Sequence, residues 1–186
     1  TNFNLNNDPN TSSCLEFNED YKDSFAFPHN HFFDYTIGDA CKLNKKLSID
    51  CVTMDYIFEN LNTDLPRPDF LSLDTQGTEY QILQGAKETL NQVVGVISEV
   101  EFHKFYKDQK LFGDVCHLLE SKGFNFIKFI PHPLVNLFPA ALETRGEGVT
   151  FASEALFFKK PELIDDDIML RKLAFIAIAF NQFGYA

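Results

Sequence analysis

One uninterrupted apolar segment constrains the fold of this chain more than any other feature. Residues 93–100 read Val-Val-Gly-Val-Ile-Ser-Glu-Val, a short run rich in β-branched side chains. Such a run is typical of a strand that is buried on both faces, as in a parallel sheet covered by helices. The segment therefore predicts a domain in which strands and helices alternate.

The sequence on both sides of this segment supports that alternation. The apolar run 70–73 predicts a strand, and the helical spacing of Leu83, Ala86 and Leu90 predicts a helix after it. A helix, two strands and a last helix are expected further along, at residues 111–122, 124–130, 149–159 and 168–180.

The order of these elements is that of the second half of a doubly wound sheet. The two later strands need no crossover helix, so they are expected to pair as an antiparallel edge. The predicted fold class is α/β: a partial Rossmann-like sheet of parallel strands with an antiparallel edge hairpin and helices on both faces. We expect one domain over residues 1–186, because the length suits a single core.

Local signals refine this outline. Thr78 followed by Gln81 has the spacing of a capping box at a helix start, and Gly85 within that helix predicts close packing on the sheet. Thr53 is expected to cap a helix over residues 54–61, after a short strand whose apolar residues alternate over 47–51.

The first part of the chain has a different composition. Residues 1–46 are rich in Asn, Asp, Ser and Phe without a sustained helical or strand period, so they are expected to be largely loop. His29, His31 and Asp34 have metal-ligating side chains, but a polar loop is the commoner meaning of such a group, and no metal site is predicted.

Charge and cysteine usage exclude several classes of function. A net charge of -11 without a basic stripe disfavours binding to nucleic acid or to an anionic membrane surface. The four cysteines contain no CxxC pair, so they indicate reduced thiols in a cytoplasmic protein and not a zinc site. The apolar run 174–180 is far shorter than the ~20 residues that span a bilayer.

Acidic side chains follow the two central strands. Asp74 begins the turn after strand 70–73, and Glu99 and Glu101 share one side of the end of the next strand, just before His103. Ligands in open α/β sheets bind at the carboxyl ends of the strands. The alternative is structural: Asp74 caps a helix, the glutamates mark a solvated strand end and His103 lies on the surface.

A resemblance to a known family favours the functional alternative. Residues 70–86 read Phe-Leu-Ser-Leu-Asp-Thr-Gln-Gly-Thr-Glu-Tyr-Gln-Ile-Leu-Gln-Gly-Ala, which is similar to the signature of FkbM-type methyltransferases. Residues 49–57 resemble the strand and helix start that precede this signature in the family. Residues 98–103, with Tyr106 and then Leu111, resemble the strand and loop that follow it.

The resemblance implies an S-adenosylmethionine-dependent methyltransferase that acts on hydroxyl oxygens of sugars, glycans or secondary metabolites. It implies that Asp74, Gln76 and Glu79 lie near the methionine end of the donor or near the acceptor. It also implies that Glu99, Glu101 and His103 face the acceptor. Transfer to oxygen also needs a base for the hydroxyl proton. The implied donor-binding residues are Asp74, Gln76, Gly77, Glu79 and Glu99. The implied catalytic residues are His103, Asp74 and Glu101.

The chain departs from the family pattern at its beginning. No strand followed by a Gly-rich turn occurs in its first half, so the strands that bind the donor are expected to be missing. A non-catalytic fragment or interaction module that keeps the fold is therefore the alternative function. The apolar stripe from Phe175 to Phe183 is expected to pack in the core or to support a homodimer.

Overall fold

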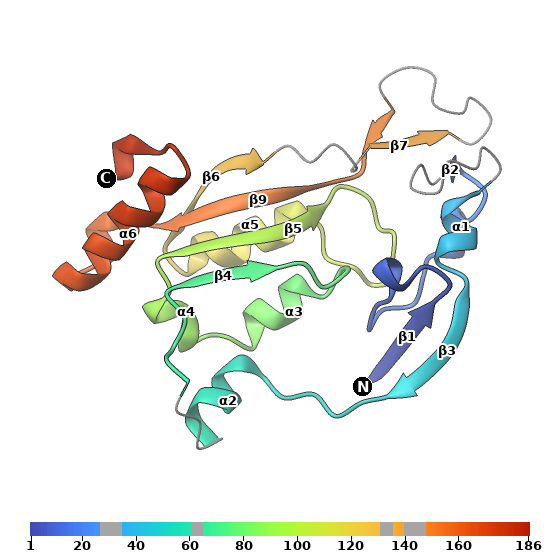
Figure 1. The fold of residues 1–186 in the computed structure, drawn as a ribbon, viewed down its shortest axis with the longest axis horizontal. Helices are drawn as coiled ribbons and strands as arrows, with labels where there is room; N and C mark the ends of the chain where they lie inside the picture. The colour runs from blue at the N-terminus through green and yellow to red at the C-terminus, as the bar shows by residue number, and fades with distance from the viewer. Residues whose placement is uncertain (27–34, 61–64, 131–135, 140–147) are drawn as a thin grey trace.

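The centre of the computed structural model is a four-stranded mixed sheet (Figure 1). The structure describes residues 1–26, 35–60, 65–130, 136–139 and 148–186. The strand order is β4-β5-β9-β6, with β4 and β5 parallel and β9 antiparallel to both of its neighbours. The bounds are Phe70–Leu73 for β4, Gly95–Glu101 for β5, Ala152–Lys159 for β9 and Phe124–Ile130 for β6.

Helices cover both faces of this sheet. One face packs against α3, α4 and α5, and the other packs against α6 (Figure 1). Leu83, Leu90 and Leu119 are fully buried on the first face, and Leu173 and Ala177 on the second. The helices span Glu79–Gln84 (α3), Thr89–Gln92 (α4), Phe112–Ser121 (α5) and Asp167–Ala179 (α6). The predicted α/β class, the parallel pair, the antiparallel pair at the sheet edge and the helices on both faces are confirmed.

The described part of residues 1–46, which were expected to be largely loop, includes several short strands and helices. It contains β1 (Asn2–Asn6), β2 (Phe25–Ala26), α1 (Ile37–Ala40) and most of β3 (Leu43–Ser48). β1 and β3 form an antiparallel pair, so the strand expected over 47–51 lies earlier in the chain. Two short strands, β7 (Asn136–Pro139) and β8 (Val149–Thr150), form a small sheet with β2.

The strand β1 was not expected, because buried amides take the place of apolar side chains in it. The Nδ2 group of Asn4 donates to the carbonyl oxygens of Ser13 and Leu15, at 3.2 and 2.8 Å, and Nδ2 of Asn6 donates to Thr11 at 2.7 Å. Both asparagines are 4% exposed. Polar and apolar residues do alternate in β1, but its buried side chains are the asparagines, whereas Phe3 and Leu5 are only half-buried, so the strand lacks an apolar core face.

The helix expected after Asp74 is divided into α3 and α4. Asp55, in α2 (Met54–Asn60), accepts hydrogen bonds from Glu88 N and from Thr89 N and Oγ1, at 3.0, 2.9 and 2.8 Å. Burial alone would raise the pKa of Asp55, but these hydrogen bonds to the carboxylate lower it overall. Asp55 thus accepts from backbone N–H groups at the start of α4 and stabilises that start. The spacing of apolar residues does not reveal this contact, because Asp55 belongs to another helix.

Two expected caps have different outcomes. Thr53 caps α2 as predicted, since its Oγ1 accepts from Tyr56 N at 3.1 Å. The capping box at Thr78 was wrong, because Thr78 makes no side-chain cap and its Oγ1 bonds to Thr75 instead. Gly85 packs against Thr53 and not against the sheet: a Cβ atom at Gly85 would lie 3.0 Å from the Thr53 side chain.

The apolar stripe predicted from Phe175 to Phe183 runs along α6 and the turn after it, and it is only partly buried. Ile176 and Phe180 pack on the sheet, whereas Phe175 and Phe183 are 75% and 69% exposed. None of the helices in the described parts of the chain is long and apolar enough to cross a membrane. All four cysteines are free thiols.

A buried lysine joins the ends of two helices at one end of the sheet. Lys159 Nζ donates to the carbonyl oxygens of Leu90 in α4 and Lys122 after α5, at 3.2 and 3.1 Å, and lies 4.7 Å from the ring centre of Phe124. Burial lowers the pKa of Lys159, and the nearby Lys122 lowers it further. The two carbonyl oxygens act in the opposite direction, because carbonyl groups at helix ends attract a cation.

Replacing Lys159 by methionine is expected to lower the free energy of unfolding by about 2 kcal/mol, because two buried carbonyl groups lose a charged donor. Urea unfolding at pH 7 measures this loss. The same substitution at the exposed Lys45 is the control and is expected to change the free energy by less than about 0.5 kcal/mol. An equal effect of the two substitutions would show that the Lys159 hydrogen bonds do not stabilise the fold.

Candidate functional site

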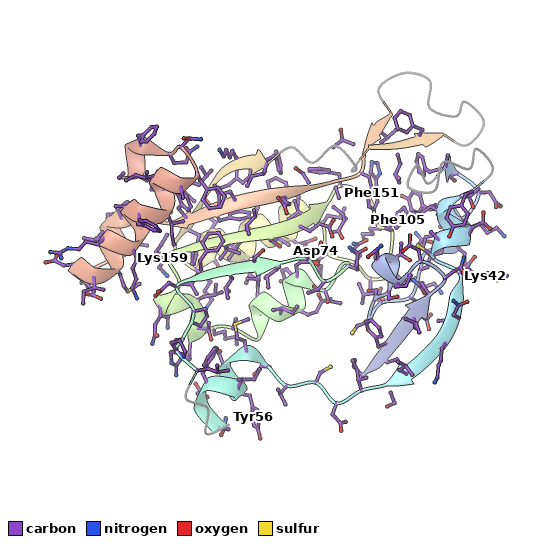
Figure 2. All side chains as sticks on the ribbon, viewed as in Figure 1. Lys42, Tyr56, Asp74, Phe105, Phe151 and Lys159 are labelled. Atoms are coloured by element: carbon purple, nitrogen blue, oxygen red, sulfur yellow. The ribbon has the colours of Figure 1, made fainter. Side chains whose placement is uncertain are left out.

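A cavity of about 890 Å³ lies at the carboxyl ends of β4 and β5. It is at the opposite end of the sheet from Lys159, in the region of Asp74, Phe105 and Phe151 (Figure 2). Three parts of the chain form its walls: the ends of the two strands, the segment after β1, and the loops that carry aromatic rings. The main lining residues are Asp74, Thr75, Gln76, Glu99 and Glu101, then Phe3, Thr11, Ser12 and Cys14, then Phe105, Tyr106, Leu137 and Phe151.

The turn after β4 is held by a buried carboxylate. Glu79, which is 2% exposed, accepts hydrogen bonds on Oε1 from Thr75 N at 2.6 Å, Thr75 Oγ1 at 2.9 Å and Gly77 N at 3.3 Å. Gln76 and Gly77 both have positive φ, 56° and 94°, so the chain reverses within two residues. This reversal directs the Gln76 side chain toward the strand ends.

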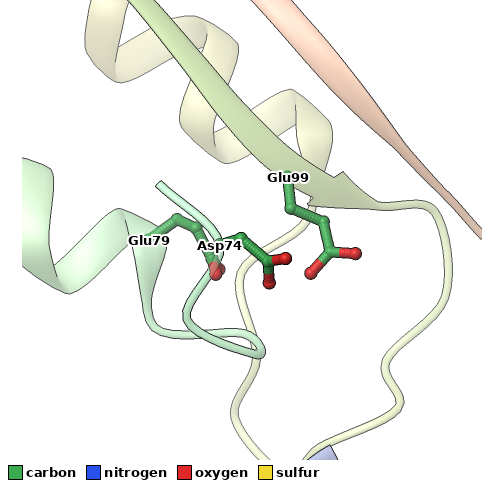
Figure 3. A group of neighbouring side chains, drawn as sticks. All are labelled: Asp74, Glu79 and Glu99. Carbon is green, nitrogen blue, oxygen red and sulfur yellow. The ribbon is translucent and has the colours of Figure 1, made fainter. Parts of the chain in front are cut away.

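Asp74 and Glu99 form a pair of carboxyl groups at the cavity wall. Figure 3 shows the two side chains directed at the same space, with Glu79 behind Asp74. Gln76 Nε2 donates to Asp74 Oδ1 at 3.0 Å and to Glu99 Oε2 at 3.1 Å. Burial, together with the negative charges of Asp74 and Glu101, raises the pKa of Glu99 to about 9. Glu99 therefore carries a proton at neutral pH, and it bonds to the Asp74 carboxylate.

Glu101 is the most enclosed carboxyl group of the cavity wall, with 3% exposure. Burial raises its pKa to about 8, and the neighbouring Glu79 and Asp74 contribute to this rise. A backbone N–H and the Gln109 side chain act in the opposite direction. The group exchanges its proton near physiological pH, which suits a general base.

Tyr106 connects the acidic pair to the amino-terminal segment. Its hydroxyl lies 2.8 Å from the Thr11 carbonyl oxygen and 3.2 Å from Gln76 Oε1, so one proton is shared between two acceptors. Burial raises the pKa of Tyr106 well above its ordinary value. Ser13 Oγ also donates to the Gln76 carbonyl oxygen, at 2.6 Å. Gln76 is thus fixed by contacts from residues far away in the sequence.

A scan against protein-family models matches residues 2–126 to the methyltransferase FkbM domain. The match includes the turn after β4, the end of β5 and Tyr106, all of which contribute to the cavity wall. This chain belongs to the FkbM methyltransferase family. The comparisons with curated proteins and with solved structures gave no match. Membership of the FkbM family implies a methyltransferase function and a methyl donor.

The structure brings together most of the residues expected to form the FkbM site. Asp74, Gln76, Glu99 and Glu101 line the cavity. Gly77 and Glu79 lie in the same turn, where Glu79 shapes the backbone. His103 is not among the lining residues. Its ring stacks against Phe151, with the ring centres 6.4 Å apart and the planes 10° from parallel.

Tyr106, Thr11 and, behind the cavity wall, Gln109 belong to the candidate site but were not selected from the sequence. Tyr106 is one of the residues that resemble the family pattern, but no sequence pattern predicted that its hydroxyl lies beside Gln76. Gln109 and Thr11 gave no signal, because their roles depend on contacts between distant segments.

The spacing of three carboxyl groups raises the question of a metal ion. Single oxygen atoms of Asp74, Glu79 and Glu99 lie within 4.8 Å of one another. Glu79 Oε1, however, already accepts three hydrogen bonds, and Gln76 Nε2 donates to the other two carboxyl groups. The cluster is explained by these hydrogen bonds, and we assign no metal ligand in it. His29, His31 and Asp34 lie outside the described residues.

Proposed function

We propose that this FkbM methyltransferase transfers a methyl group from S-adenosylmethionine to a hydroxyl oxygen of an uncharged acceptor, such as a sugar or glycan. Glu101 is the proposed base. The observation that supports the proposal is the group of three carboxyl side chains, Asp74, Glu99 and Glu101, on one wall of a cavity inside the family domain.

The charge of the cavity fits a cationic donor. When bound, S-adenosylmethionine supplies a methyl group activated by a positively charged sulfur. Asp74 provides a carboxylate at the wall, and Gln76 fixes its orientation through the 3.0 Å hydrogen bond. Among the described residues that line the cavity there is no Lys, Arg or His, so the negative charge is not neutralised from within.

The same absence of basic groups favours an acceptor without phosphate or carboxylate groups. An anion in this cavity would meet like charge and, among the described lining residues, no basic side chain to compensate it. Phe105 and Phe151 instead present ring surfaces, with their centres 4.2 Å apart. Flat apolar surfaces beside polar groups are typical of sites that bind small molecules such as sugars.

The reaction also requires a base that removes the proton of the acceptor hydroxyl. The buried Glu101 carboxylate is a stronger base than an exposed one, because its pKa is raised to about 8. The protonated Glu99 carboxyl group can donate a hydrogen bond without adding negative charge. Both side chains are mostly protonated at pH 7, but Glu101 loses its proton at a lower pH than Glu99, so the two can take different roles as the pH rises toward 8.

Calorimetric titration with S-adenosylhomocysteine tests the donor site. We expect saturable binding that weakens by about tenfold in Asp74→Asn, because a neutral amide no longer attracts the cationic part of the ligand. Asp165→Asn, an exposed position on the far side of the sheet, is the matched control.

Transfer of a labelled methyl group is then measured with matched pairs of neutral and phosphorylated sugars. We expect labelling of the neutral member of a pair. If the gene encodes residues before Thr1, the longer protein is assayed beside this chain. Failure of both forms to bind the donor product would contradict the catalytic proposal and support an interaction module.

A further inference from the structure

A buried glutamine lies directly behind the acidic wall of the cavity. Gln109 is 1% exposed and follows the loop that leaves β5. It does not line the cavity, so it is not in position to contact a ligand. Both ends of its side-chain amide nevertheless face residues of the proposed site.

The oxygen end of the amide holds the loop that carries Tyr106. Gln109 Oε1 accepts hydrogen bonds from Phe105 N at 2.8 Å and from Tyr106 N at 3.0 Å. These two residues provide aromatic side chains to the cavity wall, and the Tyr106 hydroxyl bonds to Gln76. One side chain therefore fixes the backbone of two lining residues.

The nitrogen end of the amide is directed at the acidic wall. Nε2 has no hydrogen-bond partner of standard geometry among the residues that the structure describes. It lies beside Gly77, where an added Cβ atom would be 2.8 Å from it. It is also close enough to the Glu101 carboxyl group to favour the ionised form of that group. A buried amide donor without a partner is uncommon and costs stability.

We propose that Gln109 is a positioning residue for methyl transfer, holding the Tyr106 loop through Oε1 and donating a hydrogen bond from Nε2 to the Glu101 carboxylate. This inference rests on the proposed function, because it assigns the base to Glu101. Three other groups act on Glu101: the carboxyl groups of Glu79 and Asp74, and the Glu101 backbone N–H. Gln109 is the neutral side chain that opposes the two carboxyl groups.

The test is a titration of Glu101 by carbon NMR of side-chain carboxyl groups in the full chain, which needs neither acceptor nor turnover. Gln109→Glu keeps an oxygen for Phe105 N and Tyr106 N but removes the donor, so we expect the pKa of Glu101 to rise by about one unit or more. Gln92→Glu, at an exposed position at the end of α4, is the matched control and is expected to leave this pKa unchanged.

The rate of methyl transfer provides the second measurement. In Gln109→Glu the acid limb of the pH profile of kcat is expected to move to higher pH by the same amount, with KM for the donor changed less than about twofold. If the glutamate variant does not fold, Gln109→Met removes the same donor without adding a carboxyl group and is expected to shift the pKa in the same direction.

The two measurements separate this inference from the proposed function. Glu101 titrating at the same pH in the wild type and in both variants would overturn the role of Gln109. A shifted titration in a chain that transfers no methyl group would support the contact while contradicting the proposed function.

Discussion

Replacing Glu101 by glutamine is expected to lower kcat for methyl transfer by about 10²–10⁴-fold, the usual contribution of a positioned general base. Glutamine has the same shape but cannot take the hydroxyl proton. The fold should persist, because Glu101 is already 3% exposed and its pKa of about 8 keeps it mostly neutral at pH 7.

The pH dependence makes this test specific. In the wild type, kcat is expected to rise with pH up to about 8, as Glu101 loses its proton. In Glu101→Gln the residual rate should lose this rise, while KM for the donor stays within about threefold. Glu120→Gln, on the exposed side of α5, is the control. Full activity of Glu101→Gln would exclude this residue as the base and return the assignment to Asp74.

The stability of the protein is expected to fall as the pH rises from 5 to 8, by about 3 kcal/mol in total. Both Glu99 and Glu101 have folded-state pKa values raised from 4.5, to about 9 and about 8. Above pH 4.5 the unfolded chain therefore binds fewer protons than the folded one, and each pH unit costs up to about 1.4 kcal/mol per group. Partial solvent exposure of Glu99 and coupling between the two groups reduce the sum.

Glu99→Gln should remove a large part of this dependence. At pH 8 the variant is expected to be more stable than the wild type by roughly 2 kcal/mol, and near pH 4.5 the two should be equal. Asp55 acts in the opposite direction, because its lowered pKa makes stability fall only when the pH drops below about 4. Urea unfolding at several pH values measures the difference, with Glu120→Gln as the control. A wild-type stability that is constant or rising from pH 5 to 8 would contradict the buried, protonated pair.

Features that depend on local periodicity were predictable from the sequence. The apolar segment 93–100 predicted β5, and side-chain alternation placed Glu99 and Glu101 on one side of it. The turn expected after strand 70–73 is present, and Gly77 within it has a φ of 94°. These predictions succeeded because each depends on residues that are neighbours in the chain.

Features that depend on contacts between distant segments were not predictable. Asp55 divides a helix because it reaches residues more than 30 positions away. The position of His103 depends on Phe151, a partner from another loop. The strand β1 was missed because its buried side chains are amides that bond to a later turn. In each case the decisive group comes from a part of the sequence that local patterns do not include.

The hydrogen bonds that join the amino-terminal segment to the strand ends also affect how the protein folds. Ser13 bonds to Gln76 across 63 residues, and Tyr106 bonds to Thr11 across 95. Contacts of such long sequence separation close large loops, and they usually form late in folding, after local helices and hairpins. The main sheet can therefore assemble before the cavity exists. A chain that has completed its hydrophobic core still has to dock the β1–β3 pair before it can bind a ligand.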